Sequence, residues 1–309
     1  MKQPLFYKQR QRRINLWCWA FLAPTLVLYI LFQGWPIIAS WYYAMLDWSG
    51  MSTHINFVGL KNFQEVAADR YFWNAYLNSF KFTVGVVPLQ LVSALVIALV
   101  LNNVRLKGRN IYRTIFFLPV VTVASIVGII MIFIWGPNGP VNGVLQSLQI
   151  LKTPLNWLGD IKLAMGTVVI IFTWKNMGTN MIYWLAGLQS VPQELYEAAK
   201  VDGANSVNTF RFVTLPLIMP IGIVIALLNV VGSLKVFDII KTMTEGGPFF
   251  ATDVVATYIY RYAFSSEMGL PRLGYASAAG IFFGLTIILI AVLQALITKG
   301  LKRGQADFK

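Results

Sequence analysis

The sequence predicts an all-α integral membrane protein whose chain crosses the bilayer six times. Of its 309 residues, 57% are hydrophobic and only 12% are charged, whereas a soluble domain carries about 25% charged residues. Long uncharged stretches recur along the chain, and basic residues gather in every second segment between them. Because charged side chains are costly at the centre of a bilayer, the uncharged stretches locate the crossings.

Six stretches offer the roughly 20 residues that a helix needs to cross a membrane. The expected spans are 16–41, 77–103, 114–136, 163–187, 212–234 and 274–298. The first follows a basic stretch, as a signal peptide would, but it is too long for one and predicts an uncleaved span. The fourth span is the weakest, because Lys175 stands near its middle. The apolar run 254–260 is too short to cross and predicts an interfacial or loop helix.

The distribution of basic residues predicts the orientation of the spans. If the N-terminus is cytoplasmic, the inside segments hold 15 basic residues and the longer outside segments hold eight. This is the positive-inside pattern, and it places both termini in the cytoplasm. It also accounts for the net charge of +13. Since the basic residues flank spans and do not form a groove, the sequence argues against nucleic-acid binding and favours contact with membrane lipid.

The six expected spans contain no Asp, Glu or His. Ion-coupled carriers usually need carboxylates inside the membrane, and membrane haem proteins usually need His ligands. The single cysteine, Cys18, allows no disulfide within the chain, and the single histidine, His54, is expected to be solvated. No phosphate-binding G-x-x-x-x-G-K-[ST] motif occurs. The sequence therefore predicts no metal site, no cofactor and no enzyme activity in this chain, so any energy comes from a partner.

The segment 190–216, between the fourth and fifth spans, predicts a helix, a sharp turn and a second helix. Ser190, followed three residues later by a glutamine, fits a helix start. Gly203 can take the left-handed conformation that ends a helix, and Asn205 or Ser206 can cap the next one. The second helix would continue into the fifth span. The expected orientation presents this segment to the cytoplasm.

Small and acidic side chains on this segment suit a protein contact. Ala198, Ala199 and Ala204 would let another protein approach closely, and Glu197 and Asp202 could hold its cationic groups. A solvated loop helix is the alternative interpretation.

The extended pattern is more specific. Glu197-Ala-Ala-x-x-Asp-Gly-Ala-x5-Phe210-x4-Leu215-Pro216 resembles the signature loop of permease subunits of ABC importers. Further matches are Leu22-Ala-Pro24, Phe57-Val-Gly-Leu-Lys-Asn-Phe63, Lys107-Gly-Arg109, Phe117-Leu-Pro119, Leu185-Ala-Gly-Leu-Gln189, Met243-Thr-Glu-Gly-Gly-Pro248 and Gly274-Tyr-Ala-Ser-Ala278. Together they extend the resemblance over residues 16–298. They look like the carbohydrate-uptake branch, in particular the maltose- and glycerol-phosphate-type permeases.

This resemblance implies a type I ABC importer permease bundle in a bacterial inner membrane. In that family, two homologous permease subunits form the pathway, two ATPase subunits bind ATP and Mg, and an extracytoplasmic solute-binding protein delivers the carbohydrate. The signature loop docks on an ATPase as a coupling helix. The residues that it implies as ATPase contacts are Glu197, Ala198, Ala199, Asp202, Gly203 and Ala204.

Polar and aromatic residues on the fourth and fifth spans are the candidates for contact with the solute. They are Trp174, Lys175, Asn176, Asn180, Asn229 and Ser233. The polar groups could bond sugar hydroxyls, and Trp174 could stack on a ring. Lys175 could instead snorkel or face an aqueous cavity without touching solute. The segment 235–272 is expected to face the binding protein, with a turn at 246–248, although a plain connecting loop is the alternative.

Two other functions stay open. The solute could be glycerol phosphate or another polyol derivative, but the expected spans contain only two basic residues, Lys81 and Lys175, which favours a neutral sugar. The chain could also be a membrane scaffold or channel without ATPase coupling, against which the segment 190–216 argues. The expected organisation is a cytoplasmic basic N-terminus (1–15), a first span with its outside loop (16–76), a core permease domain (77–298) and a cytoplasmic tail (299–309).

Overall fold

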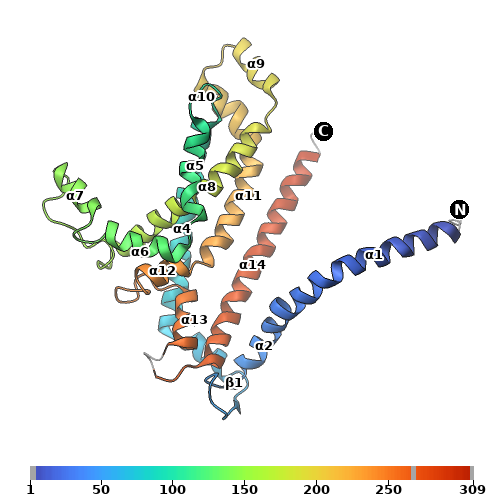
Figure 1. Cartoon of the computed structure of the whole chain (residues 1–309), viewed down its shortest axis with the longest axis vertical. Coiled ribbons are helices and arrows are strands. Elements are labelled where there is room, and N and C mark those ends of the chain that lie inside the picture. Colours follow the sequence, from blue (N-terminus) through green and yellow to red (C-terminus); the bar gives the residue numbers. More distant parts are fainter. Residues whose placement is uncertain (1–4, 266–268, 307–309) are drawn as a thin grey trace. The chain divides into compact units, whose positions relative to one another are not determined.

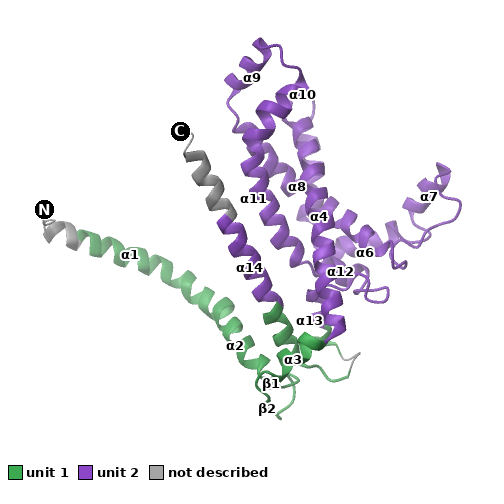
Figure 2. Cartoon of the chain, turned by 180° about the vertical axis from the view of Figure 1, so that it is seen from behind, with its two compact units in different colours: residues 1–68, 261–282 green, residues 69–260, 283–309 purple. Residues whose placement is uncertain are grey.

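The computed structural model describes residues 5–265 and 269–306, so the expected terminal segments 1–15 and 299–309 and the outer segment 235–272 lie partly outside the described residues. The described chain is almost entirely helical, with one two-stranded hairpin (Figure 1). It separates into two compact units (Figure 2). The first contains residues 1–68 and 261–282, and the second contains residues 69–260 and 283–309.

The first unit begins with one long helical run. It comprises α1 (Leu5–Tyr29), a π-helical turn (Ile30–Gly34) and α2 (Trp35–Ala44). The part Arg10–Ala44 is long and apolar enough to span a membrane, as the sequence predicts for 16–41, and none of its most apolar window is buried. This helix therefore leaves its apolar side chains to lipid or to another chain.

A hairpin and a short helix complete the first unit. Strands β1 (Leu46–Asp47) and β2 (Asn56–Phe57) pair antiparallel, and α3 (Lys61–Ala68) follows. The buried Asn62 donates from Nδ2 to the carbonyls of Ala44 and Leu46 at 2.9 and 2.8 Å, which fixes α3 against the end of α2.

The last described part of the first unit carries a bidentate ion pair. Arg272 donates to both carboxylate oxygens of Glu65, at 2.6 and 2.7 Å, and its guanidinium lies 4.5 Å from the ring centre of Tyr275. The hydrogen bond from Glu65 raises the pKa of Arg272 above its usual value. These contacts hold the start of α14 (Leu273–Ala306) against α3.

The second unit is built around three long helices. They are α4 (Arg70–Asn102), α8 (Ala164–Gln189) and α11 (Leu215–Leu234), and each packs against the other two. Shorter helices surround them: α5 (Arg109–Val121), α6 (Ala124–Ile134), α7 (Pro140–Ser147), α9 (Gln193–Val201), α10 (Ser206–Thr209) and α12 (Asp238–Met243). The helix α13 (Val255–Phe264) covers the apolar run 254–260 and is short, as the sequence predicts.

Small residues allow the long helices to approach one another. A side chain at Gly178 of α8 would meet the backbone of Phe116 and Phe117 in α5, and one at Gly222 of α11 would lie 2.5 Å from the Trp184 ring. Trp184 in turn donates from Nε1 to the Leu91 carbonyl at 3.2 Å. Close backbone approach at small residues is the usual way for membrane helices to pack.

The expected third span, 114–136, is not one straight helix. It is divided between α5 and α6, which meet at an angle of 102°. Pro119 lacks the N–H of a regular helical bond, and the following run of β-branched residues, 120–123, disfavours helix. Thr122 and Val123 have extended backbone, and Thr122 Oγ1 bonds to the Leu118 carbonyl at 3.3 Å. The expected span 114–136 therefore contains a helix break, which a charge map does not detect.

Length and composition support fewer crossings than six. Within the described residues, four helices are long and apolar enough: Arg10–Ala44, Arg70–Asn102, Ser206–Leu234 and Leu273–Leu296. The bent pair of α5 and α6 raises the number to five. The expected fourth span exists as the 26-residue helix α8 but does not meet this criterion. Lys175 and two asparagines, Asn176 and Asn180, lower its apolarity, and more than half of its residues are buried within the structure.

Candidate functional site

Two regions of the second unit carry most of the candidate functional residues. In Figure 1, α9 and α10 lie at one end of α8 and α11, and α12 and α6 lie toward the other end. We call the segment 190–216 the helix–turn–helix end. We call the region around α6, α12 and the loop 244–253 the cavity end.

At the helix–turn–helix end, Gly203 and Asn205 do what the sequence predicts. Gly203 has a φ of +74° and ends α9 in the left-handed region. Asn205 caps α10, because its Oδ1 accepts from the Asn208 N–H at 2.8 Å. Ser190 does not cap α9: it terminates α8 and donates from Oγ to the Gly187 carbonyl at 2.8 Å. Pro192 occupies the position before α9, so that helix starts without a side-chain cap.

The predicted contact residues differ in exposure. Glu197, Ala198, Asp202 and Gly203 are exposed, Ala204 is half-buried and Ala199 is 8% exposed. The four exposed residues form a small acidic surface around the turn. The two less exposed alanines belong to the turn itself: the Ala204 N–H donates to the Ala199 carbonyl at 2.9 Å.

The helix–turn–helix end is joined directly to a long helix. The run from α10 through a π-helical turn (Phe210–Thr214) to α11 is continuous over 29 residues, Ser206–Leu234. At 1.5 Å per residue it is about 43 Å long. A hydrogen bond of 3.3 Å between Thr214 Oγ1 and Tyr196 Oη ties α9 to this run. The turn and the cavity end are therefore joined by one continuous helical run.

At the cavity end, the structure brings together only two of the predicted solute residues. Lys175 and Asn176 line a cavity of about 180 Å³ between α6, α8, α11 and α12. The other residues that line it are Ala124, Phe172, Gly232, Lys235, Val236, Phe237, Asp238 and Ile239. Sequence reasoning missed Lys235 and Asp238, which it placed in an outside segment. Their only sequence signal was their position, directly after the fifth span.

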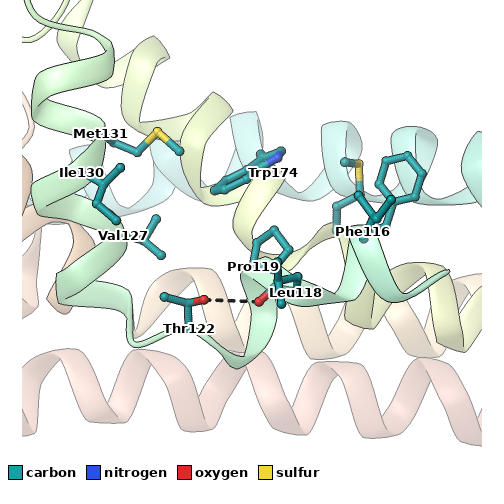
Figure 3. A pocket seen from close by; sticks show the side chains of 10 residues that line it. Phe116, Leu118, Pro119, Thr122, Val127, Ile130, Met131 and Trp174 are labelled. Carbon is teal, nitrogen blue, oxygen red and sulfur yellow. Dashed lines mark hydrogen bonds between the residues drawn. The ribbon is translucent and has the colours of Figure 1, made fainter. Parts of the chain in front are cut away.

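Trp174 lies in a different cavity. It is 40% exposed and faces a space of about 350 Å³ inside the bend between α5 and α6. Figure 3 shows it with Pro119, Val127 and Met131 around this space, which is lined almost entirely by apolar groups. Trp174 therefore does not share a cavity with Lys175.

Of the other three predicted residues, Asn180 and Ser233 are buried in the helical bundle and Asn229 is half-buried. Ser233 Oγ donates to Thr83 Oγ1 at 3.0 Å, and Asn180 Nδ2 donates to the Asn176 carbonyl at 3.2 Å. The buried Asn229 Nδ2 makes no hydrogen bond with the described residues. The same holds for Nε2 of Gln90, a buried residue of α4 that sequence reasoning did not single out. None of the three predicted residues lines the Lys175 cavity.

The loop 244–253 at the cavity end is tightly held. Asn74 and Asn78 of α4 donate to the Phe250 carbonyl at 2.9 and 3.0 Å, and Thr244 and Thr252 share a hydrogen bond of 2.7 Å. Phe249 and Phe250 both have positive φ, at +47° and +60°.

For side chains of this size such a conformation is strained, and strain of this kind is often found at functional sites. Phe249 is 87% exposed at the loop surface. The predicted turn at 246–248 is present, with the Gly247 N–H bonded to the Thr244 carbonyl at 2.7 Å.

These features define a multi-pass helical membrane protein with one exposed helix–turn–helix end. Residues 90–303 match the family described as "Binding-protein-dependent transport system inner membrane component". This match covers more than half of the chain, and the chain belongs to that family.

Curated relatives match most of the chain. The lactose transport system permease protein LacF of Rhizobium radiobacter is 33% identical over 89% of this chain and 92% of its own length. The probable starch degradation products transport system permease protein AmyD of Thermoanaerobacterium thermosulfurigenes is 33% identical over 96% and 97%. The trehalose/maltose permease MalF of Thermococcus litoralis is 33% identical over 85% and 88%.

Solved structures agree with this assignment. A chain of a bacterial alginate ABC transporter, in complex with an alginate pentasaccharide-bound periplasmic protein, has a TM-score of 0.81 and 25% identity. It covers 96% of this chain and 97% of its own. The fold is therefore that of an ABC importer permease.

Proposed function

We propose that this chain is one of two homologous permease subunits of an ATP-driven, binding-protein-dependent importer, forming half of the pathway for a sugar or oligosaccharide. The observation that carries the proposal is the exposed helix–turn–helix end, with the left-handed Gly203 and the helix cap Asn205, on a chain of this transport family. The named relatives support a sugar, since their names refer to lactose, starch products and trehalose or maltose.

The chain is not itself an enzyme in this proposal. Two separate ATPase subunits bind and hydrolyse ATP with Mg, and each receives the helix–turn–helix end of one permease. Glu197, Ala198, Ala199, Asp202, Gly203 and Ala204 are the proposed contacts. ATPase closure moves α9 and the turn, and the continuous run into α11 carries this movement to the cavity end as a rigid-body switch.

The same proposal gives six crossings of a bacterial inner membrane, with both termini in the cytoplasm. The bent pair of α5 and α6 counts as one broken crossing, and α8 counts as another. A helix that lines a pathway need not be apolar all round, because protein or water covers its polar residues. This supports α8 as a crossing despite Lys175.

The cavity end then faces the extracytoplasmic binding protein. The loop 244–253 supports this, because it presents the exposed Phe249 from a backbone fixed by Asn74 and Asn78. Exposed aromatic residues on rigid supports are typical anchors of protein interfaces.

Replacement of Gly203 by Asp tests the coupling role. The full complex, with its second permease, ATPase and binding protein, is reconstituted in liposomes, and uptake and ATPase stimulation are measured. We expect Gly203→Asp to lose both while the chain still inserts in the membrane, because a side chain in this turn is strained and projects at the ATPase. Gly143→Asp, an exposed glycine on α7 with open space around it, is the matched control. Unchanged uptake and stimulation in Gly203→Asp would remove the proposal.

A polyol or glycerol-phosphate solute remains the alternative within transport, and an uncoupled scaffold or channel is the alternative outside it. An uncoupled scaffold or channel would not co-purify with an ATPase subunit, which separates it from an importer directly.

A further inference from the structure

The cavity around Lys175 carries an unbalanced charge. Three of its lining residues are ionisable: Lys175, Lys235 and Asp238. Lys175 is 8% exposed, and Asp238 is the carboxylate that attracts it. A buried ammonium is stabilised by a nearby anion, so Lys175 and Asp238 together contribute one positive and one negative charge to the lining. Lys235 is left over, and the cavity has a net charge of +1.

Lys235 has no anionic partner of its own. Its ammonium makes no hydrogen bond or ion pair with the residues that the structure describes, and Lys235 is exposed while it lines the cavity. By contrast, Lys241 on the neighbouring helix α12 pairs with Glu245 at 3.8 Å. The charge of Lys235 is therefore available to something that enters the cavity.

The positions of the lysines in the structure differ from those on which the preference for a neutral solute rested. The spans offered Lys81 and Lys175 as basic groups, which favoured a neutral solute. In the structure Lys81 is exposed on α4 and does not line this cavity, whereas Lys235 does. Two lysines therefore line one cavity, and its single carboxylate, Asp238, can neutralise the charge of only one of them.

The remaining lining suits a sugar ring. Phe172 and Phe237 supply apolar ring faces, and Gly232 leaves space where a side chain would stand. Asn176 donates from Nδ2 to the Phe172 carbonyl at 2.9 Å, which leaves its Oδ1 able to accept from a hydroxyl. Apolar walls with a few fixed polar groups are the usual composition of a ligand site.

We propose that this cavity binds a sugar that carries one anionic group, a carboxylate or a phosphate, and that Lys235 pairs with that group. Lys175 and Asp238 contribute no net charge beside it, and both can hydrogen-bond to sugar hydroxyls. This inference rests on the proposed function and narrows its solute class. A neutral sugar would leave Lys235 without an anionic partner in the cavity, whereas a carboxylate or phosphate supplies one.

The first experiment identifies the solute independently of any mutation. The binding protein is purified with the native complex, and mass spectrometry of its released ligand shows whether the sugar is anionic. A uronic acid or sugar phosphate supports the inference. A neutral sugar overturns it while leaving the importer function intact, whereas a chain that co-purifies with no ATPase or binding protein contradicts the proposed function itself.

The second experiment assigns the charge to Lys235. Thermal shifts of the purified complex are titrated with two anionic probes, a uronate-containing disaccharide and a hexose phosphate, each against its neutral counterpart. If the solute carries a carboxylate, the uronate probe should bind more tightly than its neutral counterpart. If it carries a phosphate, the hexose phosphate should do so. Equal binding of the neutral and anionic probes would overturn the inference.

Matched lysine variants complete this test. We expect Lys235→Met to weaken binding of the anionic probe about tenfold, since the ion pair with its anionic group is lost. Lys81→Met removes the same charge outside the cavity and should leave binding within about twofold. Assembly with the ATPase, followed by size-exclusion chromatography, verifies that both variants fold. If Lys235→Met binds the anionic probe as tightly as the wild type, Lys235 does not recognise the anion.

Discussion

The helix–turn–helix end and the cavity end of the second unit are built in opposite ways. The first is made from consecutive residues, 190–216, and its turn is closed by neighbours such as Ala199 and Ala204. The second is assembled from α4, α6, α8, α11 and α12, and Lys175 and Lys235 meet there although 60 residues separate them in sequence. A local structure should tolerate changes elsewhere in the bundle, whereas an assembled one should depend on how the long helices pack.

The largest expected effect comes from breaking that packing at Gly178. A Cβ there would lie 2.8 Å from the Cα of Phe117, so α5 would have to move away from α8. We expect Gly178→Ala to destabilise the protein by about 2–3 kcal/mol, because backbone atoms cannot relax as a flexible side chain can.

Gly166→Ala is the matched control in the same helix, since its Cβ would meet nothing within 4 Å. It should be neutral or stabilising by up to about 1 kcal/mol. The midpoints of thermal unfolding of the two purified variants measure the difference. Equal midpoints would show that α5 and α8 leave room for a methyl group at Gly178.

A smaller effect is expected at the exposed tip of the cavity end. Removal of the Phe249 ring should raise the binding-protein concentration for half-maximal ATPase stimulation about tenfold, or about 1.4 kcal/mol, because a rigidly held aromatic anchor is lost. Phe249→Ala is compared with Phe249→Tyr, which keeps the ring and should behave like the wild type. An unchanged half-maximal concentration in Phe249→Ala would show that the loop does not dock the binding protein.

The smallest effect is expected at the helix–turn–helix end itself. Asn205→Ala removes the cap of α10 and should cost about 1 kcal/mol locally. Hydrogen exchange should become faster in residues 205–214 and stay unchanged at the cavity end. Asn205→Ser retains a capping oxygen and should exchange like the wild type. Faster exchange throughout the bundle would mean that the stability of the cavity end depends on the helix–turn–helix end.

The same contrast explains what the sequence could and could not predict. Gly203 and Asn205 were predictable because a turn and a cap are decided by residues a few positions apart. The cavity was not, because Lys235 joins Lys175 only through the packing of α8 and α11. The break at Thr122 escaped a charge map, and so did the positive φ of Phe249 and Phe250, since bulky residues are not expected in the left-handed region.

The structure also bears on whether the solute is a neutral or an anionic sugar, which the sequence left open. The apolar surroundings of Trp174 separate it from the polar solute candidates, and Asn180 and Ser233 have bonding partners inside the bundle. What remains is a compact polar cavity with two lysines and one aspartate. This shifts attention from a neutral sugar to an anionic one, without changing the class of transporter.

Photocrosslinking from the two ends tests the central claim most directly. A photoreactive amino acid is placed at Ala198, exposed on α9, or at Val144, exposed on α7, in the complete complex. If the helix–turn–helix end couples to the ATPase, irradiation of the Ala198 variant gives an adduct with the mass of this chain plus one ATPase subunit, and the Val144 variant gives none. An ATPase adduct from Val144, with none from Ala198, would contradict the account.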